Sequence, residues 1–212
     1  MVAMALRAAG ADPTMIIGGQ LKNIQSNAKL GVGEYLVAEA DESDGSFLFL
    51  SPLVGVVTNV DDDHMDHYKT MERLKDAFVE HLQRLPFYGA AILCADDPVL
   101  MSLRPRVTRP VVTFGVLNDA DWRARAVRLN KDGSVCEVLH KGRRALTLRL
   151  RVPGRHNVSN ALGALAAVTS RSVSDTDQAL DAMDMLLSAP IPEHLDVLAW
   201  SEHSRLKDQS YQ

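Results

Sequence analysis

Several features are scarce in this sequence, and each absence excludes a class of protein. Cysteine occurs only twice, at Cys94 and Cys136. Two cysteines without metal-ligand spacing form neither a disulfide framework nor a zinc site, so we expect both to be reduced and Cys94 to be buried in a strand. No apolar run approaches the roughly 20 residues that span a bilayer, and the N-terminus lacks the parts of a signal peptide. The sequence therefore predicts a cytoplasmic protein that makes no contact with a membrane.

Positive charge is also in short supply. The formal net charge is -4 and the pI is about 6.0. No patch of lysine, arginine and aromatic residues stands out, which argues against a nucleic-acid-binding protein. The hydrophobic fraction of 46% and the charged fraction of 24% are those of an ordinary globular protein. A chain of 212 residues is long enough for one or two domains with a real core.

The first half of the chain alternates strand-like and helix-like patterns. A helix is expected over residues 1–9, ending at Gly10, and an amphipathic helix over 69–85. Residues 20–33 are polar and contain glycine, which is typical of a loop. Short apolar runs predict buried strands at 14–17, 35–38, 54–58, 90–94 and 111–114. This alternation predicts an α/β fold with a mostly parallel sheet flanked by helices.

The pattern changes between residues 121 and 152. Apolar and polar residues alternate over 122–129, 135–140 and 146–150, and the turns between them contain Gly133 and Gly142. This predicts a small antiparallel β meander with one face open to water. Its arginines could bind phosphate, although alternating arginines on a half-exposed strand are more typical of a solvated face. A helix over 157–170 follows Pro153-Gly154.

Acidic residues follow two of the predicted strands. The stretch Glu39-Ala40-Asp41-Glu42-Ser43-Asp44-Gly45-Ser46 comes directly after the 35–38 strand, and 59–67, with three further aspartates in a row, follows the 54–58 strand. Carboxylates that are gathered together repel one another, and a divalent cation is the simplest reason to gather them. Ligands of open α/β sheets bind beyond the carboxyl ends of the strands. The alternative is that both stretches are solvated loops that form turns and cap helices.

Four motifs, in this order along the chain, resemble the central ATPase domain of the Mur ligases. They are Gly18-Gly19 to Asn27-Ala28, Leu36 to Asp44, Thr58 to Asp66, and Gly154-Arg155-His156-Asn157-Val158-Ser159-Asn160-Ala161. The resemblance runs from about Met1 to about Ala167. It implies a P-loop-NTPase-like central ATP-binding domain over residues 1–170. The phosphate-binding pattern G-x-x-G-K-[ST] is absent, so we expect the chain to begin just after that loop and to lack the preceding UDP-sugar-binding domain.

The resemblance ends before the C-terminus. We expect residues 171–212 to form a divergent tail, partly disordered, with one amphipathic helix over 175–187. The segment that leads into a third, amino-acid-binding domain of the family is not found. The resemblance therefore implies an incomplete ligase that cannot act alone, and it gives no information on oligomeric state.

The resemblance also implies a reaction, two cofactors and a set of site residues. The reaction joins L-alanine to UDP-N-acetylmuramate through an acyl phosphate, with ATP and Mg²⁺ as cofactors. The implied roles are magnesium binding and catalysis for Glu39 and His64, catalytic support for Asn59, and positioning of these ligands by Asp63 and Asp66. His156, Asn157 and Asn160 would hold the adenine, and Ser26 and Asn27 would lie near the nucleotide sugar.

Several of these residues also fit a different role. Magnesium prefers oxygen, so a histidine ligand taken alone would favour manganese or zinc. Ser26 and Asn27 could be turn residues and Asn157 a helix N-cap. At the level of function, the alternatives are a related ligase that attaches a tripeptide to the same sugar nucleotide, and a nucleotide-binding remnant without catalytic activity. A metallohydrolase built on the acidic strand ends is disfavoured by the scarcity of nearby histidines.

Overall fold

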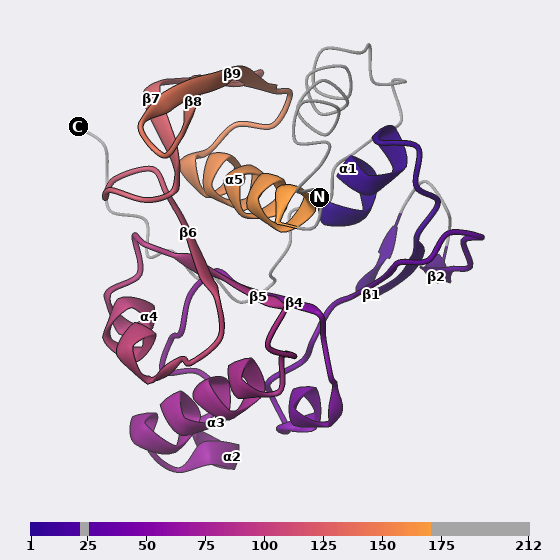
Figure 1. Cartoon of the computed structure of the whole chain (residues 1–212), viewed down its shortest axis with the longest axis vertical. Helices are drawn as coiled ribbons and strands as arrows, with labels where there is room; N and C mark the ends of the chain where they lie inside the picture. The colour runs from indigo at the N-terminus through magenta and orange to yellow at the C-terminus, as the bar shows by residue number, and fades with distance from the viewer. Residues whose placement is uncertain (22–25, 171–212) are drawn as a thin grey trace.

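The computed structural model describes residues 1–21 and 26–170. These residues form two β-sheets with helices packed around them (Figure 1). The smaller sheet has the strand order β2-β1-β3, from β1 (Thr14–Leu21), β2 (Ser26–Lys29) and β3 (Leu36–Ala38). The larger has the order β4-β5-β6-β7-β8-β9, from β4 (Val54–Val57), β5 (Ala90–Cys94), β6 (Val111–Gly115), β7 (Trp122–Asn130), β8 (Gly133–His140) and β9 (Arg143–Leu150).

The helices are short except for two. They are α1 (Val2–Ala8), α2 (Met65–Tyr68), α3 (Met71–Gln83), α4 (Pro98–Leu103) and α5 (Arg155–Thr169), with 3-10 turns η1 (Ser46–Phe49) and η2 (Arg104–Arg106). In Figure 1 the strands β4 to β6 run between α5 on one side and α3 and α4 on the other. The core of the larger sheet is therefore covered on both faces, as parallel strands require.

The larger sheet combines the two predicted patterns. Strands β4, β5, β6 and β7 are parallel neighbours, and β7 to β9 form the antiparallel meander. The predicted α/β fold is confirmed, and the meander extends the parallel sheet because Phe114 of β6 pairs with Trp122 of β7. All five residues of β5 are buried, so this strand forms the centre of the core. Cys94 is buried in β5, as expected, and Cys136 is buried as well.

The long helices follow the expected physical rules. Thr70 caps α3 because its hydroxyl accepts a hydrogen bond from the Arg73 N–H at 3.3 Å. At the other end, Arg109 donates from Nε to the Leu85 carbonyl oxygen and from Nη2 to that of Gln83, so carbonyls at and just beyond the helix end are satisfied. On α5, a Cβ at Gly163 would lie 3.1 Å from the Phe114 ring, which shows how closely this helix approaches the sheet.

The region before β3 differs from the prediction. Strand β1 continues through Gly18-Gly19 to Leu21 and pairs with β2 in an antiparallel hairpin. Ser26 and Asn27 therefore lie in a strand, and the prediction of a loop over the whole of 20–33 was wrong. Backbone pairing across the hairpin outweighs the polar composition of this segment, which is the context dependence expected of strands.

Strand β3 also differs from the prediction of a buried strand. Leu36 is 61% exposed, because β3 is the outer strand of the smaller sheet. Strand β4 is likewise the outer strand of the larger sheet. The two acid-bearing strands thus belong to different sheets and do not pair with each other. Within the described residues, no strand pairs with the outer edge of either one.

Two remaining expectations concern the ends of the molecule and the membrane. The helix predicted over 175–187 and the tail to residue 212 lie outside the described residues. Within the residues that are described, no helix is both long and apolar enough to cross a membrane.

Candidate functional site

The acidic stretch after β3 folds into tight turns. Asp41 accepts a hydrogen bond from the Ser43 N–H, and Asp44 accepts one from the Ser46 N–H, both at 2.8 Å. These local bonds to a carboxylate are typical turn chemistry. Hydrogen bonding from the side chains of Ser43 and Ser46, followed by their backbone N–H groups, lowers the pKa of both aspartates. Turn formation therefore accounts for Asp41 and Asp44, but not for Glu39 and Glu42.

The end of this stretch is fixed to α3. Phe47 is buried, and its ring lies 5.4 Å from that of Phe78 and 4.9 Å from that of His81. The Nδ1 atom of His81 is 3.1 Å from the Phe47 carbonyl oxygen. Burial lowers the pKa of His81, so the ring is held neutral, with Nδ1–H as the donor to that oxygen. The acidic loop is thus attached to a rigid helix.

The stretch after β3 meets the stretch after β4. The Nε2 atom of His64 lies 3.7 Å from Oε1 of Glu42, and the Tyr68 hydroxyl donates to the Glu42 carbonyl oxygen at 2.5 Å. Burial, followed by the charges of Glu42 and its acidic neighbours, raises the pKa of Tyr68, so the hydroxyl keeps its proton. Segments about 20 residues apart in sequence are thereby joined into one polar site.

Close packing at this junction requires glycine at position 45. Gly45 has φ +77°, a left-handed conformation, and a Cβ there would lie 3.1 Å from Nε2 of His67. His64 also has a positive φ of 60° although it is not glycine. A positive φ is uncommon for residues other than glycine, and it is maintained by the surrounding structure.

The individual residues that were predicted for the metal site are distributed around this junction. Glu39 follows β3 directly, with its N–H bonded to the Ile16 carbonyl oxygen at 2.9 Å. Asn59 donates to Asp61 Oδ2 at 2.8 Å and accepts from the Thr58 hydroxyl at 2.9 Å. Asp63 and Asp66 are exposed. Among the described residues there is no group of three or more candidate ligands that could hold a metal ion by itself.

This donor set fits magnesium only in one mode of binding. Magnesium commonly keeps several waters and takes one or two carboxylates together with substrate phosphates, instead of a complete protein cage. Glu42 is the carboxylate that meets His64, a less usual nitrogen donor for a hard cation, and Glu39 stands three residues earlier, directly after β3. The residues therefore fit a magnesium ion that is shared with phosphate. Glu42 was not among the predicted ligands, although it stands in the same acidic motif.

The second part of the predicted site is the beginning of α5. The helix begins at Arg155 with Gly154 at the N-cap position, so the interpretation of Asn157 as an N-cap was wrong. Asn157 is buried, and its Nδ2 donates to the Pro153 carbonyl oxygen at 2.7 Å. His156 is exposed and Asn160 is half-buried, four residues further along the same helix face. His156 and Asn160 are therefore accessible to a ligand together, while Asn157 fixes the turn before the helix.

A pocket of about 500 Å³ lies beside this helix start. The arginines in its lining are Arg123 and Arg125 of β7 and Arg155 of α5, and the other lining residues come from β7, β8 and the segment after β6. Sequence reasoning assigned the meander arginines to a solvated face and gave Arg155 no role. The alternation of arginines in β7 and the position of Arg155 next to His156 were the available signals.

The fold and the site together define an α/β domain with polar loops beyond the ends of its strands, where such domains bind ligands. The family model for the Mur ligase middle domain matches residues 17–168. The chain belongs to this family.

Curated relatives agree with the family assignment. The chain is 42% identical over 192 residues to the UDP-N-acetylmuramate–L-alanine ligase of Endomicrobium trichonymphae, covering 88% of this chain and 43% of the relative. It is 50% identical over 166 residues to the ligase of the same name from Syntrophotalea carbinolica, covering 78% of this chain and 36% of the relative. The chain thus spans about two fifths of the length of these relatives.

Solved structures show the same fold. The UDP-N-acetylmuramate–alanine ligase of Thermotoga maritima has a TM-score of 0.73 and 28% identity over 87% of this chain and 41% of that chain. The UDP-N-acetylmuramate:L-alanyl-gamma-D-glutamyl-meso-diaminopimelate ligase of Neisseria meningitides has a TM-score of 0.72 and 27% identity, covering 86% of this chain and 60% of that chain.

Proposed function

We propose that this chain is the ATP-binding domain of a ligase that joins L-alanine to UDP-N-acetylmuramate in peptidoglycan precursor synthesis. The observation that carries the proposal is the contact between His64 and Glu42, which joins two acidic loops in a chain with 42% to 50% identity to alanine ligases. Because the chain spans about two fifths of those relatives, we expect the 212-residue chain alone to catalyse no ligation.

The proposed reaction has two steps. The carboxylate of UDP-N-acetylmuramate takes the γ-phosphoryl group of ATP, which gives an acyl phosphate and ADP. The amine of L-alanine then attacks the acyl carbon, the amide bond forms, and phosphate leaves. Such chemistry needs little covalent work by the protein, because neutralising charge and positioning the reactants lower the barrier.

The junction of the two acidic loops is the proposed metal and phosphate end of the site. Glu39 and His64 would hold Mg²⁺, with Glu42 as a further carboxylate beside His64. The metal would supply charge neutralisation on the phosphates. Asn59 would orient the reacting groups, and Asp63 and Asp66 would support the metal ligands through their negative charge. Tyr68 and Phe47 keep the acidic loop in place during the reaction.

The beginning of α5 is the proposed adenine end. His156 is exposed and offers a flat ring for stacking, and Asn160 on the same face offers the paired donor and acceptor that a purine edge needs. The Nδ2 group of Asn157 donates a hydrogen bond to the Pro153 carbonyl oxygen, so Asn157 would position this turn instead of using Nδ2 to contact the base. Ser26 and Asn27 of β2 are the proposed contacts to the nucleotide sugar.

A second candidate is the ligase that attaches a tripeptide to the same sugar nucleotide. The observation in its favour is the TM-score of 0.72 with the Neisseria meningitides enzyme, nearly equal to the 0.73 with the alanine ligase. The curated sequence relatives at 42% to 50% identity favour alanine. A third candidate, a nucleotide-binding remnant without activity, would still release heat when it is titrated with magnesium and ATP.

A chimeric enzyme tests the proposal within a full-length ligase. Residues 17–168 would replace the matching stretch of the Syntrophotalea carbinolica ligase. We expect phosphate release that depends on ATP, UDP-N-acetylmuramate and L-alanine, within about tenfold of the parent ligase. A folded chimera without activity would favour the third candidate. Comparing L-alanine with the tripeptide as substrates of the full-length parent protein separates the first candidate from the second.

A further inference from the structure

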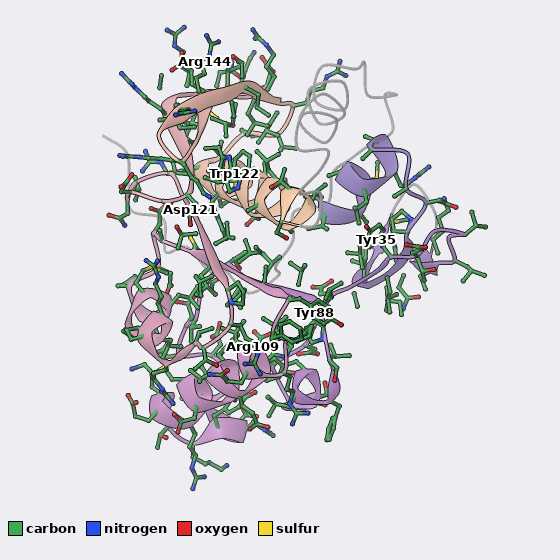
Figure 2. The ribbon with its side chains drawn as sticks, in the orientation of Figure 1. Tyr35, Tyr88, Arg109, Asp121, Trp122 and Arg144 are labelled. Atoms are coloured by element: carbon green, nitrogen blue, oxygen red, sulfur yellow. The ribbon has the colours of Figure 1, made fainter. Side chains whose placement is uncertain are left out.

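The pocket beside α5 is lined by three arginines from two elements. Arg123 and Arg125 are two residues apart on β7 and therefore lie on the same face of the strand. Arg155, the first residue of α5, lines the same pocket. Figure 2 labels Asp121 and Trp122 at the start of β7, and Arg144 in β9, the outer strand of the meander.

The three arginines differ in their partners. Arg123 forms an ion pair with Asp119, with 3.4 Å between Nη1 and Oδ1. Within the part of the chain that the structure describes, Arg125 and Arg155 make neither an ion pair nor a hydrogen bond. Arg155 also stands at the N-terminal end of a helix, where a positive charge is unfavourable. The positive charge of Arg155 is therefore not stabilised by its own helix. A bound anion would stabilise it.

The nearby carboxylates are engaged elsewhere or do not neutralise the pocket. Asp96 accepts hydrogen bonds from the N–H groups of Val116, Leu117 and Asn118. Asp121 accepts from both the N–H and the hydroxyl of Thr113. Glu137 is opposite Arg125 in the β7–β8 ladder, but it forms no ion pair with it among the described residues. The three arginines therefore leave a surplus of positive charge in the pocket.

The shape of the pocket is set by an irregularity in β7. The pairing with β8 shifts between Arg125 and Arg128, and Ala126 in the pocket wall has φ +52°. Bulges of this kind change the direction of side chains and are enriched near functional sites. Leu117, Val127 and Leu139 add apolar wall. The volume of about 500 Å³ falls in the range that holds a small-molecule ligand.

We propose that this pocket binds the phosphate group of a small molecule, with Arg125 and Arg155 as its principal ligands and Arg123 as a third. Guanidinium groups pair with phosphate oxygens in a bidentate, charge-assisted geometry, which explains arginine at these positions. Two sources of the phosphate share this chemistry. One is a nucleotide whose base lies against His156 and Asn160, which rests on the proposed function; the other is a separate phosphorylated compound.

Calorimetric titration of the purified 212-residue chain with pyrophosphate tests the proposal. We expect Arg125→Ala and Arg155→Ala each to weaken pyrophosphate binding by about tenfold or more, and Arg125→Lys to weaken it as well because lysine lacks the fork. Arg73→Ala is the matched control, since Arg73 is exposed and lies on α3, on the other side of the larger sheet from α5 (Figure 1), and it should change binding less than about twofold. Arg155→Ala should not lower the melting temperature, so lost binding cannot be attributed to unfolding.

A competition experiment separates the two sources. If pyrophosphate displaces ATP, and His156→Ala weakens ATP binding but not pyrophosphate binding, the pocket holds nucleotide phosphates. If ATP and pyrophosphate bind at the same time, the pocket binds a separate phosphorylated compound. In that case the pocket proposal holds even if the proposed function is wrong. The proposal is overturned if pyrophosphate does not bind at millimolar concentration, or if Arg125→Ala, Arg125→Lys and Arg155→Ala bind it as Arg73→Ala does.

Discussion

Tyr68, at the end of α2, donates its hydroxyl hydrogen to the carbonyl oxygen of Glu42, 26 residues earlier in the chain. This bond joins the loop after β3 to the loop after β4. Tyr68 is 5% exposed, and the bond is part-buried. Tyr68→Phe should lower the free energy of unfolding by about 1 kcal/mol, since a part-buried carbonyl loses its partner while the ring keeps its packing. Urea denaturation measures this change.

Tyr88→Phe is the control for Tyr68→Phe. Tyr88 is 62% exposed and, among the residues that the structure describes, makes only a ring contact with Phe87, so the loss of its hydroxyl should change stability by less than about 0.5 kcal/mol. Limited proteolysis should show faster cleavage within 39–46 for Tyr68→Phe only. Equal stability of the two variants would mean that the Tyr68 bond does not hold the junction together.

His81 predicts a pH dependence of stability. Burial lowers its pKa below the ordinary value of 6.5. Below that pH, the His81 ring is therefore protonated more readily in the unfolded chain than in the folded chain. The stability that the neutral ring contributes is fully present above pH 6.5 and is lost as the pH falls from there toward the lowered pKa. His81→Asn should reduce the difference in unfolding free energy between about pH 7.5 and about pH 5.5, because its amide does not titrate.

The control for His81 is His156→Asn, which replaces an exposed ring and should leave the pH dependence unchanged. His140 contributes in the same direction as His81, since burial also lowers its pKa. The prediction therefore concerns the difference between the parent chain and each variant. If His81→Asn retained the full loss of stability at about pH 5.5, the neutral, hydrogen-bonded state of the ring would be contradicted.

Asp96 predicts a large effect from a single carboxylate. Its oxygens accept three backbone N–H bonds, from Val116, Leu117 and Asn118, and thereby shape the segment after β6. Asp96→Ala leaves these donors without that partner and should cost about 3 kcal/mol in unfolding free energy. Asp119→Ala, which removes an exposed carboxylate from the same segment, should cost less than about 1 kcal/mol. Thermal denaturation of the two variants compares them, and equal costs would contradict this role of Asp96.

The outer edges of β3 and β4, which pair with no strand in residues 1–21 and 26–170, predict self-association. Neither β3 nor β4 carries a charge or a proline, and Leu36 and Val56 are exposed at 61% and 36%. Uncharged, unpaired edges invite pairing with another chain. We expect the 212-residue chain to form concentration-dependent oligomers and Leu36→Lys to reduce them, as measured by size-exclusion chromatography with light scattering. Leu129→Lys, at an exposed site on β7, is the control and should have no such effect.

The sequence predicted the elements whose pattern is determined locally. Helix α3 carries apolar residues at helical spacing between a threonine cap and a proline stop, and β5 is an uninterrupted apolar run. Strand β2 could not be predicted from Ser26 to Lys29, because its polar residues form a strand only through pairing with β1. The exposure of Leu36 depends on which strands lie beside β3, and a single strand's sequence does not encode that.

The candidate site was predictable in part for the same reason. The two acidic loops were predicted to form one site from their positions after strands. The structure brings the loops into contact, and metal binding by their residues stays a prediction. The pairing of His64 with Glu42, the anchoring by Tyr68 and the use of the Asn157 amide within the turn all depend on distances across the fold. The pocket formed by Arg125 and Arg155 joins residues about 30 apart in sequence, which alternation within one strand cannot reveal.

The magnesium dependence of the chimeric ligase tests the central claim most directly. The claim is that the junction of the two acidic loops binds the metal that neutralises the phosphates. His64→Ala and Glu39→Gln should each lower kcat by about 100-fold or more and raise the magnesium concentration needed for half-maximal rate. Asp44→Asn, a carboxylate used only in a turn, should leave both quantities nearly unchanged. A folded His64→Ala or Glu39→Gln chimera with the parent's kcat and magnesium dependence would contradict the account.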